Sequence, residues 1–373
     1  MIWLIFGLTI IFAVVLGFAN GANDNAKGVA TLVGSKLMKM KGAIIYAAIS
    51  TGLGSLAAVW IGAELASKFK GKGIVSDGIL GAGAFPLCVG IAAGLTVLIA
   101  TRVKMPISTT HAMVGAIIGI GLAGSGLNWS AVWGKFFYPL LASPLVAVFA
   151  AAGLYLILKG FRKASGVKAE TCLCVGECVG ADGSMVMMQT GIRLEQGEIA
   201  QCERKYTGHF VGLSAQRVVD VLHVVSAGLL SFARGLNDTP KVAALMFAGA
   251  MVVEGFDVGH GGPVVLIGMA IAVGGVLMVK RVAETMSYEI TGMNDGQALS
   301  ANMTAAFLVI VASKWGVPVS TTHVTCGSLF GIGTVSGEAK WKMISKIAGS
   351  WVLTLPVGAM IGAGSWWLMG LMV

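Results

Sequence analysis

Charged residues are scarce in this chain, and familiar motifs of soluble proteins are missing. Charged side chains make up only 12% of the 373 residues, whereas soluble domains carry roughly 25%. This composition excludes an ordinary soluble protein. No Gly-x-x-x-x-Gly-Lys-Ser/Thr loop for nucleotide phosphates occurs, which argues against a primary pump. Basic residues outnumber acidic ones by 26 to 17, but no basic and aromatic module accompanies them, so nucleic acid is not expected as a partner.

Apolar residues fill the chain instead. They make up 56% of it and raise the mean hydropathy to +0.85, which indicates an integral membrane protein surrounded by lipid. Uncharged runs long enough to cross a hydrocarbon core of about 30 Å recur, and in lipid such runs must be helices because their backbone groups need internal hydrogen bonds. The first run lacks a preceding basic segment and is expected to be a span, not a cleaved signal. The runs are 1–24, 43–63, 79–101, 136–158, 258–279, 315–337 and 347–373.

Two motifs each occur twice. Residues 18–27 and 232–241 both fit Phe-Ala-x-Gly-x-Asn-Asp-x-x-Lys. About 85 residues after each copy comes Pro-x-Ser-Thr-Thr-His, at 106–111 and at 318–323. The Asn-Asp motifs are 214 positions apart and the Ser-Thr-Thr-His motifs 212, so the spacing is kept in both halves. The chain therefore contains an internal duplication.

The distribution of basic residues predicts the topology. The first, third and central loops carry nine basic residues, against four in the second and fourth, which places the N-terminus outside and the central segment in the cytoplasm. Five spans then separate the two copies, so the halves are antiparallel. Residues 105–134 carry no formal charge apart from a protonatable histidine and exceed one simple span. The sequence predicts an all-α polytopic protein of the cell (inner) membrane, with two inverted-topology repeats and broken or re-entrant helices.

A polar insert separates the halves. Residues 159–220 hold 15 of the chain's 43 formal charges, so we divide the chain into a first transmembrane repeat at 1–158, a cytoplasmic insert at 159–220 and a second, inverted repeat at 221–373. The insert contains Cys172, Cys174, Cys178 and Cys202. Their spacing is not standard for zinc or an iron–sulfur centre, so a metal site and free thiols are both open interpretations.

The duplicated motifs have the chemistry of a transport site. Polar, glycine-flanked interruptions of apolar segments in inverted repeats point to a site at the repeat interface near mid-membrane. Ser-Thr-Thr after a proline suits a helix start, where hydroxyls and free backbone N–H groups bind an oxyanion. Asp24 and Asp238 are intramembrane carboxylates, which are costly unless they serve function. Beside Asn and hydroxyl oxygens they suit Na⁺ or a proton, whose charge would offset that of the anion.

Simpler roles compete with these. The Asn-Asp and Ser-Thr-Thr motifs could be helix caps alone, and His111 and His323 could be structural or direct participants. Lys27 and Lys241 are interpreted as boundary residues whose ammonium groups reach the membrane surface. Ser and His three positions apart lack an acidic third member, so an enzyme is not expected. A pore with paired half-helices is the remaining rival, and only flux measurements separate it from a coupled transporter. Asn294-Asp295-Gly296 is expected to form a turn.

Gly-Ala-Asn-Asp at 21–24 and Gly-Leu-Asn-Asp at 235–238, joined to two Pro-x-Ser-Thr-Thr-His motifs, resemble the inorganic phosphate transporter (PiT) family. The resemblance covers both halves but not the insert. It implies a cation-coupled symporter with an inverted-repeat fold that imports inorganic phosphate by alternating access. The implied sodium ligands are Asn23, Asp24, Asn237 and Asp238. The implied phosphate-binding residues are Asn23, Asp24, Ser108, Thr109, Thr110, Asn237, Asp238, Ser320, Thr321 and Thr322.

The sequence departs from that family at two points. Lys27 stands where many members have a small or neutral residue, and the second span lacks an acidic residue, the nearest being Glu64. The coupling ion, expected to be Na⁺, therefore remains open between Na⁺ and H⁺, and no other cofactor is implied. The family also includes sulfate permeases, so another tetrahedral oxyanion is the alternative substrate. Phosphate near neutral pH still carries a proton to donate to an aspartate, which favours phosphate. Membrane lipid is an expected contact, and the sequence leaves homo-oligomerisation open.

Overall fold

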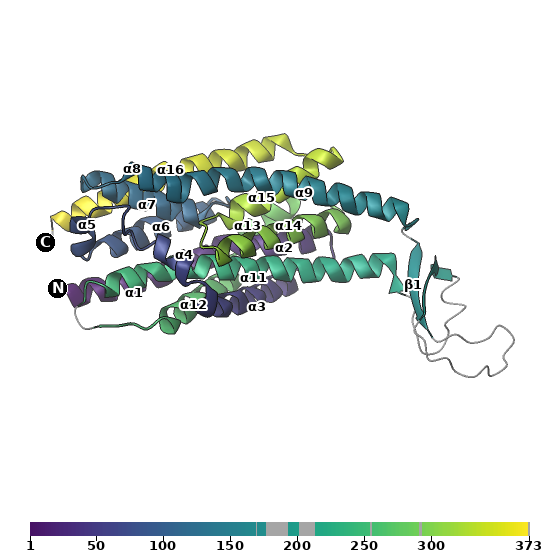
Figure 1. The fold of residues 1–373 in the computed structure, drawn as a ribbon, viewed down its shortest axis with the longest axis horizontal. Helices are drawn as coiled ribbons and strands as arrows, with labels where there is room; N and C mark the ends of the chain where they lie inside the picture. Colours follow the sequence, from purple (N-terminus) through teal and green to yellow (C-terminus); the bar gives the residue numbers. More distant parts are fainter. Residues whose placement is uncertain (169, 177–192, 201–212, 254–255, 291–292, 372–373) are drawn as a thin grey trace.

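The computed structural model describes residues 1–373 except 169, 177–192, 201–212, 254–255, 291–292 and 372–373. The described residues form an elongated helix bundle with a small sheet beyond one end, and both termini lie at the opposite end (Figure 1). The first half contains α1 (Ile2–Asp24), α2 (Ala26–Gly34), α3 (Met40–Ile61), α4 (Ala63–Lys68), α5 (Asp77–Gly81), α6 (Phe85–Arg102), α7 (Thr109–Ala123), α8 (Trp129–Val132), the π-helix η1 (Trp133–Phe137) and α9 (Tyr138–Ala164). The second half contains α11 (Ala215–Ala250), α12 (Gly261–Leu277), α13 (Lys280–Glu284), the π-helix η2 (Thr285–Ile290), α14 (Asp295–Lys314), α15 (Thr321–Ser336) and α16 (Trp341–Gly370).

Helices long and apolar enough to cross a membrane dominate the bundle. Seven occur in the described residues, and α12 with the bent segment that follows it would make an eighth. Many of their large apolar side chains face outward, such as Phe149 and Val352, each 73% exposed, as lipid-facing surfaces require. The predicted polytopic all-α membrane fold is confirmed. Two predicted runs are divided differently: 79–101 splits into α5 and α6, and 315–337 begins with an extended connector before α15.

The two halves repeat the same packing. α1 packs against α12 as α11 packs against α3, and α7 packs against α16 as α15 packs against α9. Gly21 and Gly235, from the two Asn-Asp motifs, permit the first two contacts, because a Cβ at these positions would collide with the carbonyls of Ile271 and Thr51. In Figure 1, α9 runs from the end that carries the termini towards the sheet, whereas α16 runs back. Corresponding helices thus point in opposite directions, as inverted repeats require.

Two helical hairpins enter the bundle from opposite sides. The α6–α7 hairpin turns at residues 103–108 and the α14–α15 hairpin at 315–320. Lys104 and Gly316 take left-handed φ values of 62° at equivalent points of the two turns, and a proline follows two residues later in each. α7 has 15 residues, which at about 1.5 Å per residue gives about 22 Å, less than the roughly 30 Å hydrocarbon core. α7 is therefore too short for a simple span, and the tips of both hairpins end inside the protein.

The Asn-Asp motifs, by contrast, barely interrupt their helices. Asn25 alone separates α1 from α2 and keeps helical backbone angles, φ −63° and ψ −20°. α11 continues without a break through Asp238 and Pro240. Asn294 is wrongly predicted as part of a turn: it caps α14, and its side chain and that of Gln297 form a capping box. That pair satisfies backbone N–H groups that a helix start otherwise leaves unpaired.

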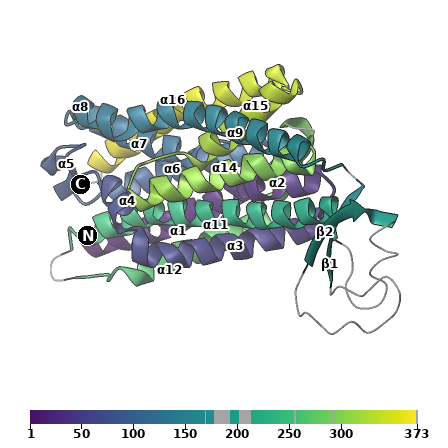
Figure 2. The same cartoon turned by 45° about the vertical axis from the view of Figure 1, so that its right-hand side comes forward.

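Within the predicted insert, 159–220, α9 continues to Ala164 and α11 already begins at Ala215. The described residues between these two helices include a three-stranded antiparallel sheet in the order β2-β1-β3, which projects beyond the helices (Figure 2). Cys172 is disulfide-bonded, so it is neither a free thiol nor a metal ligand there. Cys178 and Cys202 lie outside the described residues, and among the described residues no group of three His, Cys, Asp or Glu side chains could hold a metal ion. The strands are β1 (Thr171–Gly176), β2 (Arg193–Glu198) and β3 (Leu213–Ser214).

Candidate functional site

The two hairpin tips meet where α1–α2 and α11 carry the Asn-Asp motifs. Thr322 Oγ1 donates a hydrogen bond of 2.7 Å to the Ile107 carbonyl, and Thr110 Oγ1 lies 3.4 Å from the Val319 carbonyl. Each tip therefore supplies a hydroxyl to the backbone of the other. Thr110 and Thr322, both predicted as anion ligands, hold the tips together in this structure.

Asn23 fixes the first tip. Its Nδ2 donates to Thr101 Oγ1 at 3.0 Å and to the Met105 carbonyl at 2.9 Å, and its Oδ1 accepts from the Ile107 N–H at 3.1 Å. One side chain thus bonds the end of α6 and two backbone groups of the turn. Because all three bonds are buried or partly buried, Asn23 is committed to holding this tip.

Asn237 makes the equivalent, weaker attachment to the second tip. Ser313 Oγ donates to Asn237 Oδ1 at 3.1 Å, and Asn237 Nδ2 lies 3.4 Å from the Val319 carbonyl and 3.0 Å from Asp238 Oδ1. The amide therefore shares its donors between the turn and the neighbouring carboxylate. Both asparagines, predicted as substrate and sodium ligands, hold the hairpin tips that contain the predicted serines and threonines.

Ser108 and Ser320 are helix caps. Their hydroxyls accept from the backbone N–H groups of His111 and His323 at 3.1 and 3.2 Å. The next residues, Thr109 and Thr321, direct their hydroxyls towards the charged centre: Asn20 Nδ2 donates to Thr109 Oγ1 at 3.0 Å. The helix starts of α7 and α15 thus face the same buried volume, as the duplicated motif predicts, and their free N–H groups carry partial positive charge.

The two aspartates lie close together at this centre. Asn20 Nδ2 is 3.1 Å from Asp24 Oδ2 and 3.3 Å from Asp238 Oδ2, so one amide group contacts both carboxylates. Asp24 is 1% exposed and Asp238 3%. Two carboxylates at this depth need cations nearby, because an uncompensated buried charge is very costly.

Those cations are Lys27 and Lys241. Lys27 Nζ lies 2.8 Å from Asp24 Oδ1, and Lys241 Nζ lies 3.4 Å from Asp238 Oδ1. Each pair is three residues apart on one helix face, a spacing that brings side chains together. The two lysines are 1% and 2% exposed. Their interpretation as boundary residues that reach the membrane surface is therefore wrong, because the helices carry them into the centre of the bundle.

Sequence reasoning also missed Arg234 and Asn20, which occupy equivalent positions four residues before the two aspartates. Arg234 is 2% exposed, and its Nη2 donates to Asn25 Oδ1 at 3.0 Å and to Thr51 Oγ1 at 2.6 Å. Its Nε and Nη1 have no hydrogen-bond partner among the described residues. The signal was present in the sequence, since an arginine inside an apolar run next to an Asn-Asp motif marks function in a membrane helix.

His111 and His323 contact each other rather than the capping serines. Their ring centroids are 4.3 Å apart, and the His323 ring lies 4.0 Å from that of Trp351. His323 Nδ1 is also 3.2 Å from the Leu140 carbonyl. Among the described residues, the hydrogen bonds of the Ser108 and Ser320 hydroxyls go to backbone N–H groups and neither goes to a histidine ring. The rings pack the two hairpins together behind their tips.

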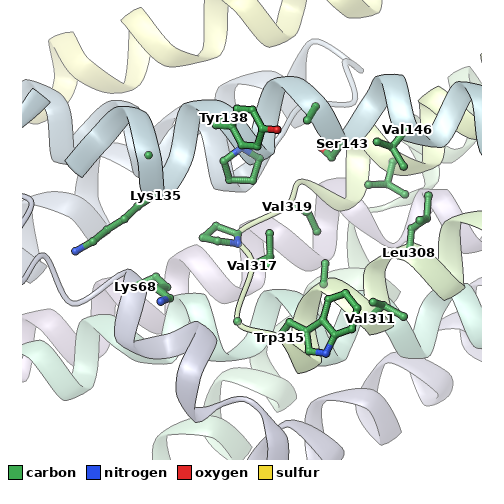
Figure 3. Close-up of a pocket in the computed structure, with 17 residues that line it drawn as sticks. Lys68, Lys135, Tyr138, Ser143, Val146, Leu308, Val311, Trp315, Val317 and Val319 are labelled. Carbon is green, nitrogen blue, oxygen red and sulfur yellow. The ribbon is translucent and has the colours of Figure 1, made fainter. Parts of the chain in front are cut away.

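An apolar groove adjoins the second tip. It has a volume of about 610 Å³ and lies between α9 and the connector 315–319, with Trp315 and Val311 on one wall and Tyr138 and Val146 on the other (Figure 3). Lys68 and Lys135 also line it. Val319 separates the groove from the charged centre, since its carbonyl accepts from Lys241. The second tip therefore has open volume behind it.

Known proteins resemble this chain in sequence and in fold. The chain is 27% identical to a protein of Thermococcus kodakarensis named as a phosphate permease, over 97% of this chain and 96% of the relative. It is 30% identical to a protein of the same description from Helicobacter pylori strain J99, over 88% and 69% of the two chains. A solved structure, the sodium-dependent phosphate transporter, shares the fold with a TM-score of 0.77 at 22% identity, over 99% of this chain and 100% of that one.

The residues that match the family lie in both halves. Residues 20–362 match the phosphate transporter family, a stretch that begins at Asn20 and includes both Asn-Asp motifs, both hairpins and the insert. The family and the structural neighbour are transporters, so the chain is not an enzyme. The duplicated motifs, the membrane-spanning bundle and this match together show that the chain belongs to the phosphate transporter family.

Proposed function

We propose that this protein imports inorganic phosphate by cation-coupled symport, with the anion bound between the helix starts of α7 and α15. The observation that carries the proposal is the meeting of two helix N-termini with three buried cationic side chains, Lys27, Lys241 and Arg234. Helix N-termini and basic groups attract oxyanions. The family match supports phosphate as the cargo.

The carboxylates favour phosphate over sulfate. Asp24 and Asp238 accept hydrogen bonds, and phosphate near neutral pH retains a proton that it can donate to either. Sulfate has no such proton, so an aspartate beside it would be repelled without a compensating hydrogen bond. Thr109 and Thr321 have hydroxyls that can turn towards the anion. The anion ligands we propose at the helix starts are Ser108, Thr109, Thr110, Ser320, Thr321 and Thr322, with Asn23, Asp24, Asn237 and Asp238 beside them.

The coupling cation, Na⁺ or H⁺, is proposed to act at the two Asn-Asp motifs. Carboxylate and amide oxygens are the ligands that hard cations prefer.

We further propose that the N-terminus lies outside the cell and the insert in the cytoplasm. Alternating access then requires the hairpin tips to separate first on one side and then on the other, and the groove behind the α14–α15 tip gives that tip room to move.

Uptake of radiolabelled phosphate into proteoliposomes tests this function. We expect phosphate to accumulate above its equilibrium level when an inward Na⁺ or proton gradient is imposed, and not without one. Excess sulfate should compete weakly. Equilibration without accumulation would indicate a pore instead, and uptake of sulfate in preference to phosphate would indicate a sulfate permease of the same fold.

A further inference from the structure

The ammonium group of Lys27 lies between the two halves of the protein. Its Nζ is 2.8 Å from Asp24 Oδ1 and donates to Thr321 Oγ1 at 3.0 Å. Asp24 belongs to α1, whereas Thr321 begins α15 in the other half. A carboxylate and a hydroxyl from opposite repeats thus converge on one nitrogen.

Lys241 has an equivalent environment with one more oxygen. Its Nζ donates to the Val319 carbonyl at 2.7 Å and to Thr110 Oγ1 at 2.9 Å, and it lies 3.4 Å from Asp238 Oδ1. Carboxylate, carbonyl and hydroxyl oxygens are the ligands of hard cations such as Na⁺. At both positions, therefore, a lysine nitrogen occupies the place among oxygens that a bound cation would need.

The buried charges at the centre already balance a monovalent anion. Among the described residues, the buried side chains with a permanent formal charge are Asp24, Asp238, Lys27, Lys241 and Arg234. Three cationic and two anionic groups leave one net positive charge when all are ionised. A monovalent oxyanion makes the site neutral, whereas a divalent one leaves a negative charge in a low-dielectric interior. Neutral residues at 27 and 241 would instead make the empty site negative by one charge, and an anion would then need added cations.

We propose that Lys27 and Lys241 are tethered counter-cations at the two coupling positions, so that the protein takes the monovalent form of its tetrahedral oxyanion without sodium. This inference rests on the proposed function and specifies its coupling chemistry. Monovalent phosphate brings its own proton: once inside, it dissociates to divalent phosphate and one proton. Net transport is then divalent phosphate with H⁺. Sulfate, which is divalent and carries no proton, leaves the site with an unbalanced charge.

Wild-type protein in proteoliposomes gives the first test, with choline replacing Na⁺ at constant ionic strength. Initial rates of phosphate uptake with and without Na⁺ are expected to agree within about twofold, since the remaining effect of ionic composition on a buried site is small. Purified protein should show no saturable binding of ²²Na⁺. A pH-sensitive dye inside the vesicles should report acidification that accompanies phosphate entry.

The double variant Lys27→Asn/Lys241→Asn gives the second test, because each amide removes the positive charge and introduces an oxygen that can bind a cation. In choline its uptake should fall at least about tenfold, since the carboxylates lose their buried partners, and Na⁺ should restore part of it. Lys36→Asn is the matched control. Lys36 is exposed, and its left-handed φ of 63° suits asparagine, so its uptake should remain sodium-independent and near wild type.

Strict dependence of wild-type uptake on Na⁺, with saturable ²²Na⁺ binding, would overturn the inference while phosphate transport stands. Sodium-independent uptake at the wild-type rate in the double variant would overturn it equally. If the double variant does not fold, the wild-type measurements alone decide. The proposed function itself would be overturned if phosphate did not enter the vesicles under any imposed gradient and also did not stabilise the purified protein.

Discussion

The two halves of the site differ although their motifs match. Asp24 lies near two donors, Lys27 and Asn20. Asp238 lies near four, which are Asn20, Asn237, Thr321 and Lys241. The ion pair of the first half is short, at 2.8 Å, and that of the second is 3.4 Å because Lys241 is drawn to the second tip. Duplication thus supplied one framework, and single residues then gave the two carboxylates different surroundings.

The largest expected effect comes from the carboxylates. Asp24→Asn and Asp238→Asn each remove one partner of a buried ion pair, which costs about 3–5 kcal/mol, and phosphate uptake should fall below about a tenth of wild type. Asp238→Asn should be the more severe, because its new NH₂ group must face donors that now surround the carboxylate. Vesicle uptake and thermal unfolding in detergent would measure both. Wild-type transport by both variants would contradict the site assignment.

The second largest effect is expected at the two asparagines that hold the hairpin tips, whose loss should lower stability by different amounts. Asn23→Ala leaves the buried Ile107 N–H without its acceptor and removes two further bonds, so we expect a loss of about 2–3 kcal/mol in stability. Asn237→Ala should cost only about 1 kcal/mol. After that change, Ser313 still donates to the Val309 carbonyl, and the Val319 carbonyl still accepts from Lys241. Thermal unfolding of the two variants side by side checks this, and equal losses would show that the tips are held alike.

A third difference separates Arg234 from its counterpart Asn20. Arg234→Gln removes one buried positive charge and should weaken phosphate binding by about tenfold, which corresponds to about 1.4 kcal/mol. Arg234→Lys keeps the positive charge but offers fewer hydrogen-bond donors, so it should recover part of that affinity. Phosphate-dependent shifts in thermal stability give the binding constants. Unchanged affinity in Arg234→Gln would place this arginine outside the electrostatics of the anion.

The smallest expected effect is the loss of stability on removing a serine cap, which should be equal in the two halves. Ser108→Ala and Ser320→Ala each remove a helix cap with nearly the same geometry, so each should cost about 1 kcal/mol. The glycine variants at the same two positions should lower the free energy of unfolding by only a few tenths of a kcal/mol, since glycine is tolerated at the cap. Chemical or thermal unfolding would measure all four variants. Because both serines are also proposed anion ligands, phosphate affinity should fall in the alanine variants as well, and unchanged affinity would show that the two hydroxyls act as caps alone.

The sequence was sufficient wherever a local pattern decides the structure. The helix start after Ser108, the break within 105–134 and the relation between the halves all follow from short motifs and their spacing. The location of Lys27 did not, because α2 packs against α11 of the second half and the Lys27 ammonium group bonds Thr321 at the start of α15, both far away in the chain. Hydropathy also misassigned 315–337, since a connector buried in protein resembles one buried in lipid. The roles of the predicted ligands stay predictions.

The exchange of packing partners between the halves also constrains how the chain can be assembled. The inner face of α7 rests on α16, and that of α1 rests on α12, so neither partner exists while the first half is being synthesised. Although α1 and α7 both also pack against α6 of the first half, most of the protein must be synthesised before these early helices have all of their final neighbours. Until then their small-residue faces are accessible to insertion factors, chaperones and proteases in the membrane. Two fragments divided within the insert should accordingly accumulate only when they are produced together.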